Sequence, residues 1–188
     1  MSIKRVFLSL AVAVLWGCSV KVPRGLEPVE NFELERYLGR WYEVARLDHS
    51  FERGMTDVTA EYSMRKDGGV KVLNRGYKLD KKKWVDAEGK AYFVKDEKTG
   101  FLKVSFWGPF YGAYVIFRLD SENYNYALVS GPDKKYLWLL SRTPTLSKAT
   151  KAHLVSFAKS HGFETDDLYY VTHNRRGDVK ETPSSLGE

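Results

Sequence analysis

Turn-forming residues recur at short, regular intervals through the middle of the chain, and this spacing limits the fold more than any other feature. Breaks such as Asp67-Gly68-Gly69 and Gly131-Pro132-Asp133 separate segments rich in β-branched and aromatic residues, with no helical pattern between them. Strands joined in sequence by short turns pair antiparallel, and about eight of them can close an up-and-down barrel that holds one small ligand. The pattern predicts an all-β fold, an eight-stranded antiparallel barrel. Its strands are expected at roughly 41–48, 56–66, 69–79, 84–95, 101–107, 113–120, 124–130 and 136–142.

Two helical segments flank the predicted strands. A short helical turn is expected between Asn31, as N-cap, and Gly39, as the stop. After the last strand, an amphipathic segment from Ser147 to Gly162 predicts one C-terminal helix packed on the outer wall of the barrel. The apolar run from Leu168 to Val171 is expected to return to the sheet, and residues 176–188 are expected to form a flexible tail.

The N-terminus has the layout of a secretory signal. Two basic residues precede the apolar segment from Val6 to Leu15, which is much shorter than the roughly 20 residues of a membrane-spanning helix. Cys18 is the only cysteine of the chain and directly follows this segment. The stretch Leu15-Trp16-Gly17-Cys18 resembles a bacterial lipobox. The resemblance implies a lipoprotein signal peptide at 1–17, acylation of Cys18 and a lipidated tether over 18–30.

The residue after the cysteine indicates a destination. Ser19 stands where the inner-membrane retention signal of bacterial lipoproteins would be an aspartate. By this resemblance the protein is expected to be lipid-anchored in the bacterial outer membrane. Several acyl chains together anchor firmly, because each buried CH2 group contributes about 0.8 kcal/mol.

The first predicted strand begins with the motif Gly39-Arg40-Trp41-Tyr42, and the last one ends at Arg142. In an eight-strand meander followed by a helix, this pattern resembles the lipocalin family. The segments 51–54, 103–112 and 127–144 are similar to the bacterial outer-membrane lipocalins. The resemblance implies a lipocalin domain over 31–175, with Trp41 closing the floor of the barrel and Arg142 lying across its ring as a cation–π partner. These roles of Gly39, Trp41 and Arg142 are structural.

Because side chains alternate along a strand, the family pattern also implies which residues face the cavity. With Trp41 facing inward, Ala45 and Met64 would face inward as well. The expected ligand-binding residues are mostly apolar with a few polar groups: Glu43, Ala60, Tyr62, Val72, Asn74, Phe93, Val104, Phe106, Val129, Tyr136 and Trp138. A buried Glu43 needs a basic group or the head of a ligand as its partner.

The first loop would lie at the open end. Phe51 and Met55 are expected to gate the entrance there, and Arg53 is placed to meet an acidic head group.

These features favour binding of a small hydrophobic or amphipathic ligand, most simply a fatty acid or a lysophospholipid. Two alternatives stay open: the same barrel binding haem or another porphyrin, and a structural lipoprotein whose side chains fill the barrel.

The sequence contains no nucleophile elbow, P-loop or paired metal-ligand spacing, and its histidines are scattered. We therefore expect no enzyme activity, no metal, no cofactor and no nucleic-acid partner. Lysine runs such as Lys81-Lys82-Lys83 are expected to be solvated, with a weaker hypothesis that they touch anionic lipids. Whether two copies form a homodimer is left open.

Overall fold

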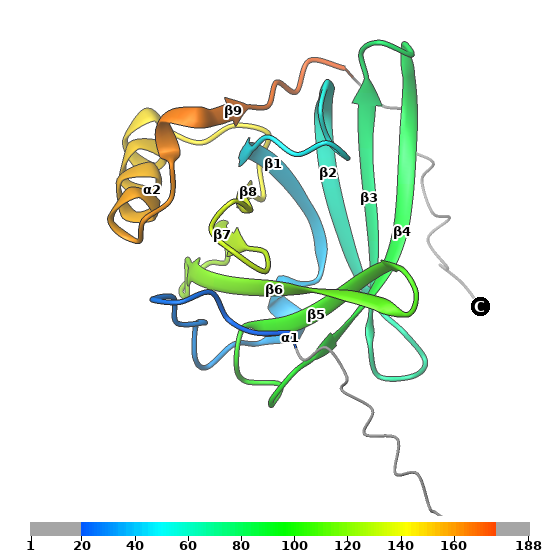
Figure 1. Cartoon of the computed structure of the whole chain (residues 1–188), viewed down its shortest axis with the longest axis vertical. Helices are drawn as coiled ribbons and strands as arrows, with labels where there is room; N and C mark the ends of the chain where they lie inside the picture. Colours follow the sequence, from blue (N-terminus) through cyan, green and yellow to red (C-terminus); the bar gives the residue numbers. More distant parts are fainter. Residues whose placement is uncertain (1–19, 176–188) are drawn as a thin grey trace, which may run out of the picture.

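The computed structural model describes residues 20–175. Nine strands and two α-helices account for most of this range (Figure 1). The strands are β1 (Gly39–Leu47), β2 (Met55–Met64), β3 (Val70–Lys78), β4 (Lys83–Phe93), β5 (Phe101–Trp107), β6 (Phe110–Leu119), β7 (Tyr126–Ser130), β8 (Leu137–Ser141) and β9 (Leu168–Tyr170). The predicted signal peptide, Cys18 and the predicted tail over 176–188 lie outside the described residues.

Strands β1 to β8 form a closed antiparallel barrel, as predicted. Each strand pairs with its sequence neighbours, and β1 closes the ring by pairing with both β2 and β8. In the closing register, Trp41 lies opposite Ala60 of β2 and Tyr42 lies opposite Ser141 of β8. Short turns therefore place alternate connections at the same end of the barrel.

The helices lie outside the ring of strands. Helix α1 (Leu34–Tyr37) has Glu33 as its N-cap, so the expected N-cap at Asn31 is wrong. Asn31 has a φ of 54° and belongs to the irregular chain before the helix. Helix α2 (Lys148–Ser160) begins as predicted, with Ser147 Oγ accepting a hydrogen bond from the backbone N–H of Thr150 at 3.0 Å. No helix within residues 20–175 is long and apolar enough to cross a membrane.

The barrel wall separates two hydrophobic clusters. The inner cluster fills the lower part of the barrel and includes Trp41, Ile116 and Val129. The outer cluster lies between the strands and α2, where Leu154 and Ala158 are fully buried. Figure 1 shows α2 beside the barrel next to β9. The prediction of a C-terminal helix packed on the outer wall is confirmed.

A β-bulge in the first strand changes which residues face the cavity. The register of β1 with β8 shifts between Glu43, which lies opposite Leu140, and Ala45, which lies opposite Leu139. The extra residue reverses the alternation beyond it. Ala45 consequently packs in the outer cluster, so its expected inward orientation is wrong.

The segment 168–175, which includes β9, closes a gap between β1 and β2. Beyond Tyr42, β1 pairs with β9 instead of β2, as the predicted return of the 168–171 run requires. The backbone N–H of Asp57 in β2 donates to the carbonyl of Thr172 at 2.8 Å. Asp57 Oδ1 accepts from the backbone N–H groups of Asn174 and Arg175 at 2.7 and 2.8 Å. The segment 168–175 thus completes the wall of the upper barrel.

Candidate ligand site

The floor of the barrel is built around Trp41. Its side chain is fully buried, and its Nε1–H donates to the carbonyl of Tyr37 at 2.8 Å. The Arg142 guanidinium lies over the indole ring, with its Cζ 4.0 Å from the ring centroid. The same guanidinium donates to the carbonyls of Arg36 and Arg40 at 2.6 and 2.9 Å. Arg142 therefore joins α1 to β1 and covers Trp41 at this end.

Next to Trp41, at the closed end of the barrel, three tyrosine hydroxyls meet. Tyr114 Oη is 2.8 Å from Tyr37 Oη and 2.7 Å from Tyr62 Oη. Burial raises the pKa of all three phenols, so they stay neutral and act as hydrogen-bonding groups. An apolar cavity of about 20 Å³ lies beside them, which is room for roughly one water molecule. It is lined by Phe32, Leu34, Tyr37, Tyr62, Val70, Val72, Ala91, Leu102, Val104 and Tyr114.

Most of the residues expected in the wall belong to the inner cluster. Tyr62, Val72 and Val129 are buried there, and Ala60, Phe93 and Val104 pack against it while remaining partly accessible. Ala60 lies opposite Trp41, Phe93 ends β4 beside Phe32, and Val104 lines the small cavity. These residues therefore line the lower half of the barrel, and its upper half lies toward the β1–β2 loop.

Phe106 and Asn74 face this upper interior. Phe106 shares the face of β5 that carries Val104, and 37% of its surface is exposed. A Cβ on Gly89 would lie only 2.8 Å from Phe106 Cδ1, so glycine in β4 lets the phenylalanine ring lie flat against the wall. Asn74 Oδ1 is buried without a hydrogen-bond partner among the described residues. It can accept from a polar group inside the barrel.

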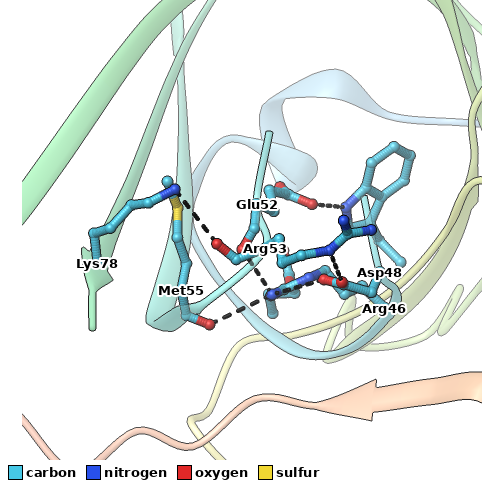
Figure 2. A network of polar contacts seen from close by, with 8 residues as sticks. Arg46, Asp48, Glu52, Arg53, Met55 and Lys78 are labelled. Atoms are coloured by element: carbon cyan, nitrogen blue, oxygen red, sulfur yellow. Dashed lines mark hydrogen bonds and ion pairs between the residues drawn. The ribbon is translucent and has the colours of Figure 1, made fainter. Parts of the chain in front are cut away.

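A buried ion cluster occupies one side of the upper barrel. Arg46 Nη1 donates to Glu43 Oε1 at 2.7 Å, and both side chains are almost completely buried. The bulge that turns Ala45 outward is what brings Arg46 to the same face as Glu43. Arg46 Nη2 also donates to the carbonyls of Glu52 and Met55, at 2.8 and 3.4 Å, and so holds the β1–β2 loop (Figure 2).

Trp138 and Glu52 extend this cluster. Trp138 of β8 lies opposite Arg46 in the register, and its Nε1–H donates to Glu52 Oε2 at 3.0 Å. Only 7% of Glu52 is exposed although it lies in a loop. Among the described residues no donor reaches Glu43 Oε2 or Glu52 Oε1. The two carboxylates therefore keep acceptor capacity for the polar head of a ligand.

The cluster holds two buried carboxylates for one buried guanidinium, and its charges are coupled. The pKa of Glu43 is raised to about 8: burial is the largest cause, nearby Glu52 also raises it, and Arg46 lowers it. Burial also raises the pKa of Glu52. Arg46 stays charged, because its acidic neighbours outweigh the effect of burial on its pKa. Near neutral pH the cluster can therefore take up or release a proton when a charged group approaches.

The remaining residues expected at the entrance surround this cluster. The ring of Phe51 stacks on His49, and Met55 begins β2 with its side chain near Gly76 of β3. Arg53 is exposed and its Nε is paired with Asp48 Oδ2 at 2.8 Å. Tyr136 lies just before β8 and stacks on the other side of His49, with ring centroids 4.3 Å apart.

Sequence reasoning missed Arg46, Glu52 and Tyr114 as interior residues. Strict alternation from Trp41 turns Arg46 outward, and nothing in a loop glutamate signals that it is buried. Tyr114 could have been found, because it lies on the same face of β6 as the buried Ile116.

The chain matches the model of the Lipocalin-like domain family over residues 32–173. The chain is a lipocalin. It is 57% identical over 168 residues to the outer membrane lipoprotein Blc of Vibrio cholerae, which covers 89% of this chain and 98% of that protein. It is 50% identical over 162 residues to the outer membrane lipoprotein Blc of Escherichia coli K12, covering 86% of this chain and 91% of that protein.

Solved structures share the fold of this lipocalin. Insecticyanin from the tobacco hornworm Manduca sexta superimposes with a TM-score of 0.63 at 24% identity, covering 81% of this chain and 85% of that one. The bacterial relatives confirm the prediction of an outer-membrane lipoprotein. Lipocalins are ligand-binding carriers rather than enzymes.

Proposed function

We propose that this lipocalin is an envelope carrier for a single-chain amphiphile, a fatty acid or a lysophospholipid, held at the membrane through acylated Cys18. The observation that carries the proposal is the division of the barrel interior. An apolar lower wall ends at three neutral tyrosine hydroxyls, and one buried ion cluster lies higher up beside the mouth. This arrangement suits a ligand whose tail is in the barrel and whose polar head is near Glu43, Arg46 and Glu52.

A tail that reaches the tyrosines would require side chains to move. The cavity beside the tyrosines holds only about 20 Å³, far less than the 300–1,000 Å³ typical of ligand pockets. Val104 lines this cavity and is partly accessible, as are Phe93 and Phe106, so these side chains are the ones that can turn aside. Burial of apolar surface, at about 25 cal/mol per Å², would drive the exchange.

Native mass spectrometry of the delipidated and refolded protein, offered an envelope lipid extract, tests the proposal. We expect one single-chain lipid per barrel. Val72→Phe, which fills the small cavity, should reduce the retained lipid at least tenfold, since one bulky group in a packed site costs about 1–3 kcal/mol. Met64, which was expected to face inward, is 51% exposed at the end of β2. Met64→Phe is therefore the matched control, because it adds bulk to a side chain that is largely in contact with solvent.

The small cavity also favours a second candidate, a structural lipoprotein whose barrel is filled by its own side chains. A refolded protein that retains no lipid, and whose tryptophan fluorescence ignores every amphiphile offered, would establish that function and exclude the carrier.

Anchoring has its own test. Metabolic labelling with palmitate should label the protein, and Cys18→Ser should abolish both the label and fractionation with membranes. A Cys18→Ser protein that still fractionates with membranes would contradict the anchor.

A further inference from the structure

Large apolar side chains are exposed on the loops at the open end of the barrel. In the β5–β6 hairpin, 83% of Trp107 and 78% of Phe110 are accessible to solvent. Leu79 in the β3–β4 hairpin and Phe51 in the β1–β2 loop are also exposed. Elsewhere in the described chain, most large apolar side chains are buried in the two hydrophobic clusters. Exposed apolar groups gathered at one end of a protein mark an interaction surface.

The exposed groups are carried by two projecting hairpins. Both the β3–β4 and the β5–β6 hairpins extend on the right side of Figure 1, away from α2. The β1–β2 loop is tied to the first of them, because Leu79 N–H donates to the carbonyl of Gly54 at 3.0 Å and Lys78 Nζ donates to the carbonyl of Arg53 at 3.4 Å. Phe51 and Leu79 are therefore presented by joined loops.

Charge next to these side chains identifies the partner. Leu79 is followed by Asp80, the only acid in that turn, and then by the exposed Lys81, Lys82 and Lys83. The β5–β6 hairpin from Val104 to Phe110 carries no charge at all. Tryptophan and phenylalanine at a surface with adjacent lysines fit the interface of a bilayer that contains anionic phospholipids.

We propose that the tips of the β3–β4 and β5–β6 hairpins dock on a phospholipid surface, with Trp107 and Phe110 inserted at headgroup level and Lys81–Lys83 contacting anionic headgroups. This proposal takes only the lipid anchor from the proposed function. It adds to that function an orientation in which the mouth of the barrel faces the membrane that supplies its lipid.

Site-directed fluorescence on the acylated mature protein tests the docking. Cys18 is the only cysteine and is blocked by acylation, so Phe110→Cys accepts a single NBD label. The protein is reconstituted into vesicles of phosphatidylethanolamine and phosphatidylglycerol with a brominated phosphatidylcholine as quencher. We expect a blue-shifted, strongly quenched label at position 110, and an unshifted label in the control Met64→Cys, whose side chain is exposed at the opposite end.

The same label at position 110 tests whether Lys81, Lys82 and Lys83 contribute to docking. Combined Lys81→Glu, Lys82→Glu and Lys83→Glu should lower the ratio of docked to undocked label at least tenfold, since each near-surface lysine contributes about fivefold. The matched control makes the same charge change at the closed end, with Lys66→Glu, Lys95→Glu and Lys98→Glu, and should leave the ratio unchanged.

Equal aqueous signals from positions 110 and 64 would overturn the docking. A blue shift at position 110 without vesicles, growing with protein concentration, would overturn it in favour of contact between two copies of this chain.

Native mass spectrometry of unlabelled protein tests the carrier function separately. Retained lipid together with a label in water would support the carrier function and contradict the docking. A label embedded in the membrane without retained lipid would support the docking and contradict the carrier function.

Discussion

The two ends of this barrel use the same side-chain chemistry in opposite ways. At the closed end, Trp41 is fully buried, and Arg142 covers it while donating to backbone carbonyls. At the open end, Trp107 and Phe110 are exposed to solvent, and Arg46 is buried with two carboxylates inside the wall. The barrel therefore has one end whose side chains stabilise the fold and another whose apolar and charged groups remain available to a partner.

The two ends differ in what their polar side chains bind. The closed end is covered by α1, and Trp41 and Arg142 donate hydrogen bonds to backbone carbonyls there. The open end is formed by four loops and by the segment 168–175, and its buried charges pair with each other and with the backbone of a loop. We expect substitutions at the closed end to change mainly stability, and those at the open end to change binding as well.

Trp41→Ala would break the closed end and has the largest expected effect. Loss of a buried tryptophan should lower the free energy of unfolding by about 3–5 kcal/mol, because it leaves a cavity under Arg142. Urea denaturation measures the change. The matched control Trp107→Ala should stay within about 0.5 kcal/mol of the unaltered protein, since Trp107 is exposed. Similar losses for both variants would contradict the contrast between the ends.

Arg46→Met would test whether the open end also depends on a buried charge. Removing the guanidinium leaves Glu43 and Glu52 buried without their cation, and should cost about 3 kcal/mol in unfolding free energy. Adding Glu43→Leu to Arg46→Met should restore part of the loss, because the unpaired carboxylate is then gone. A double variant as unstable as Arg46→Met alone would show that Glu43 and Arg46 are not coupled.

Asp57→Asn would test whether the segment 168–175 closes the barrel wall. Burial alone would raise the pKa of Asp57, but hydrogen bonds from Thr56 and from Arg175 lower it overall. A lowered pKa means that Asp57 stabilises the fold above its unfolded pKa, and this contribution is lost as the pH falls through the folded value. The variant should lose about 2 kcal/mol at neutral pH, with faster hydrogen exchange in segment 168–175. Unchanged exchange there would contradict this role.

The pH dependence of stability would sharpen the assignment of the ion cluster. The pKa of Glu43 is raised to about 8, so the folded protein holds a proton that the unfolded chain loses near its ordinary value. The unfolding free energy should therefore fall as the pH rises from about 5 to 8, by at most about 1.4 kcal/mol per pH unit. Glu43→Gln should flatten this slope. Thermal unfolding at several pH values measures it, and an equal slope in the variant would assign the proton elsewhere.

The sequence by itself determined the barrel. Regular turns such as Asp67-Gly68-Gly69 act through local geometry and period-two patterning, and the strands and α2 lie where these patterns predict. The motif from Gly39 to Tyr42 and Arg142 carry the resemblance to the lipocalin family, which implied the observed contact of Arg142 with Trp41. The inward phase of Val72, Val104 and Val129 came from the same family pattern.

Only the tertiary structure decided the polar chemistry of the interior. The bulge after Glu43 turns Ala45 outward and Arg46 inward, and alternation cannot reveal one extra residue in a strand. Glu52 is buried because a folded loop brings it to Trp138, 86 positions away. Side-chain packing between α1 and several strands leaves a cavity of only about 20 Å³ beside the three tyrosines, and no local pattern contains this property.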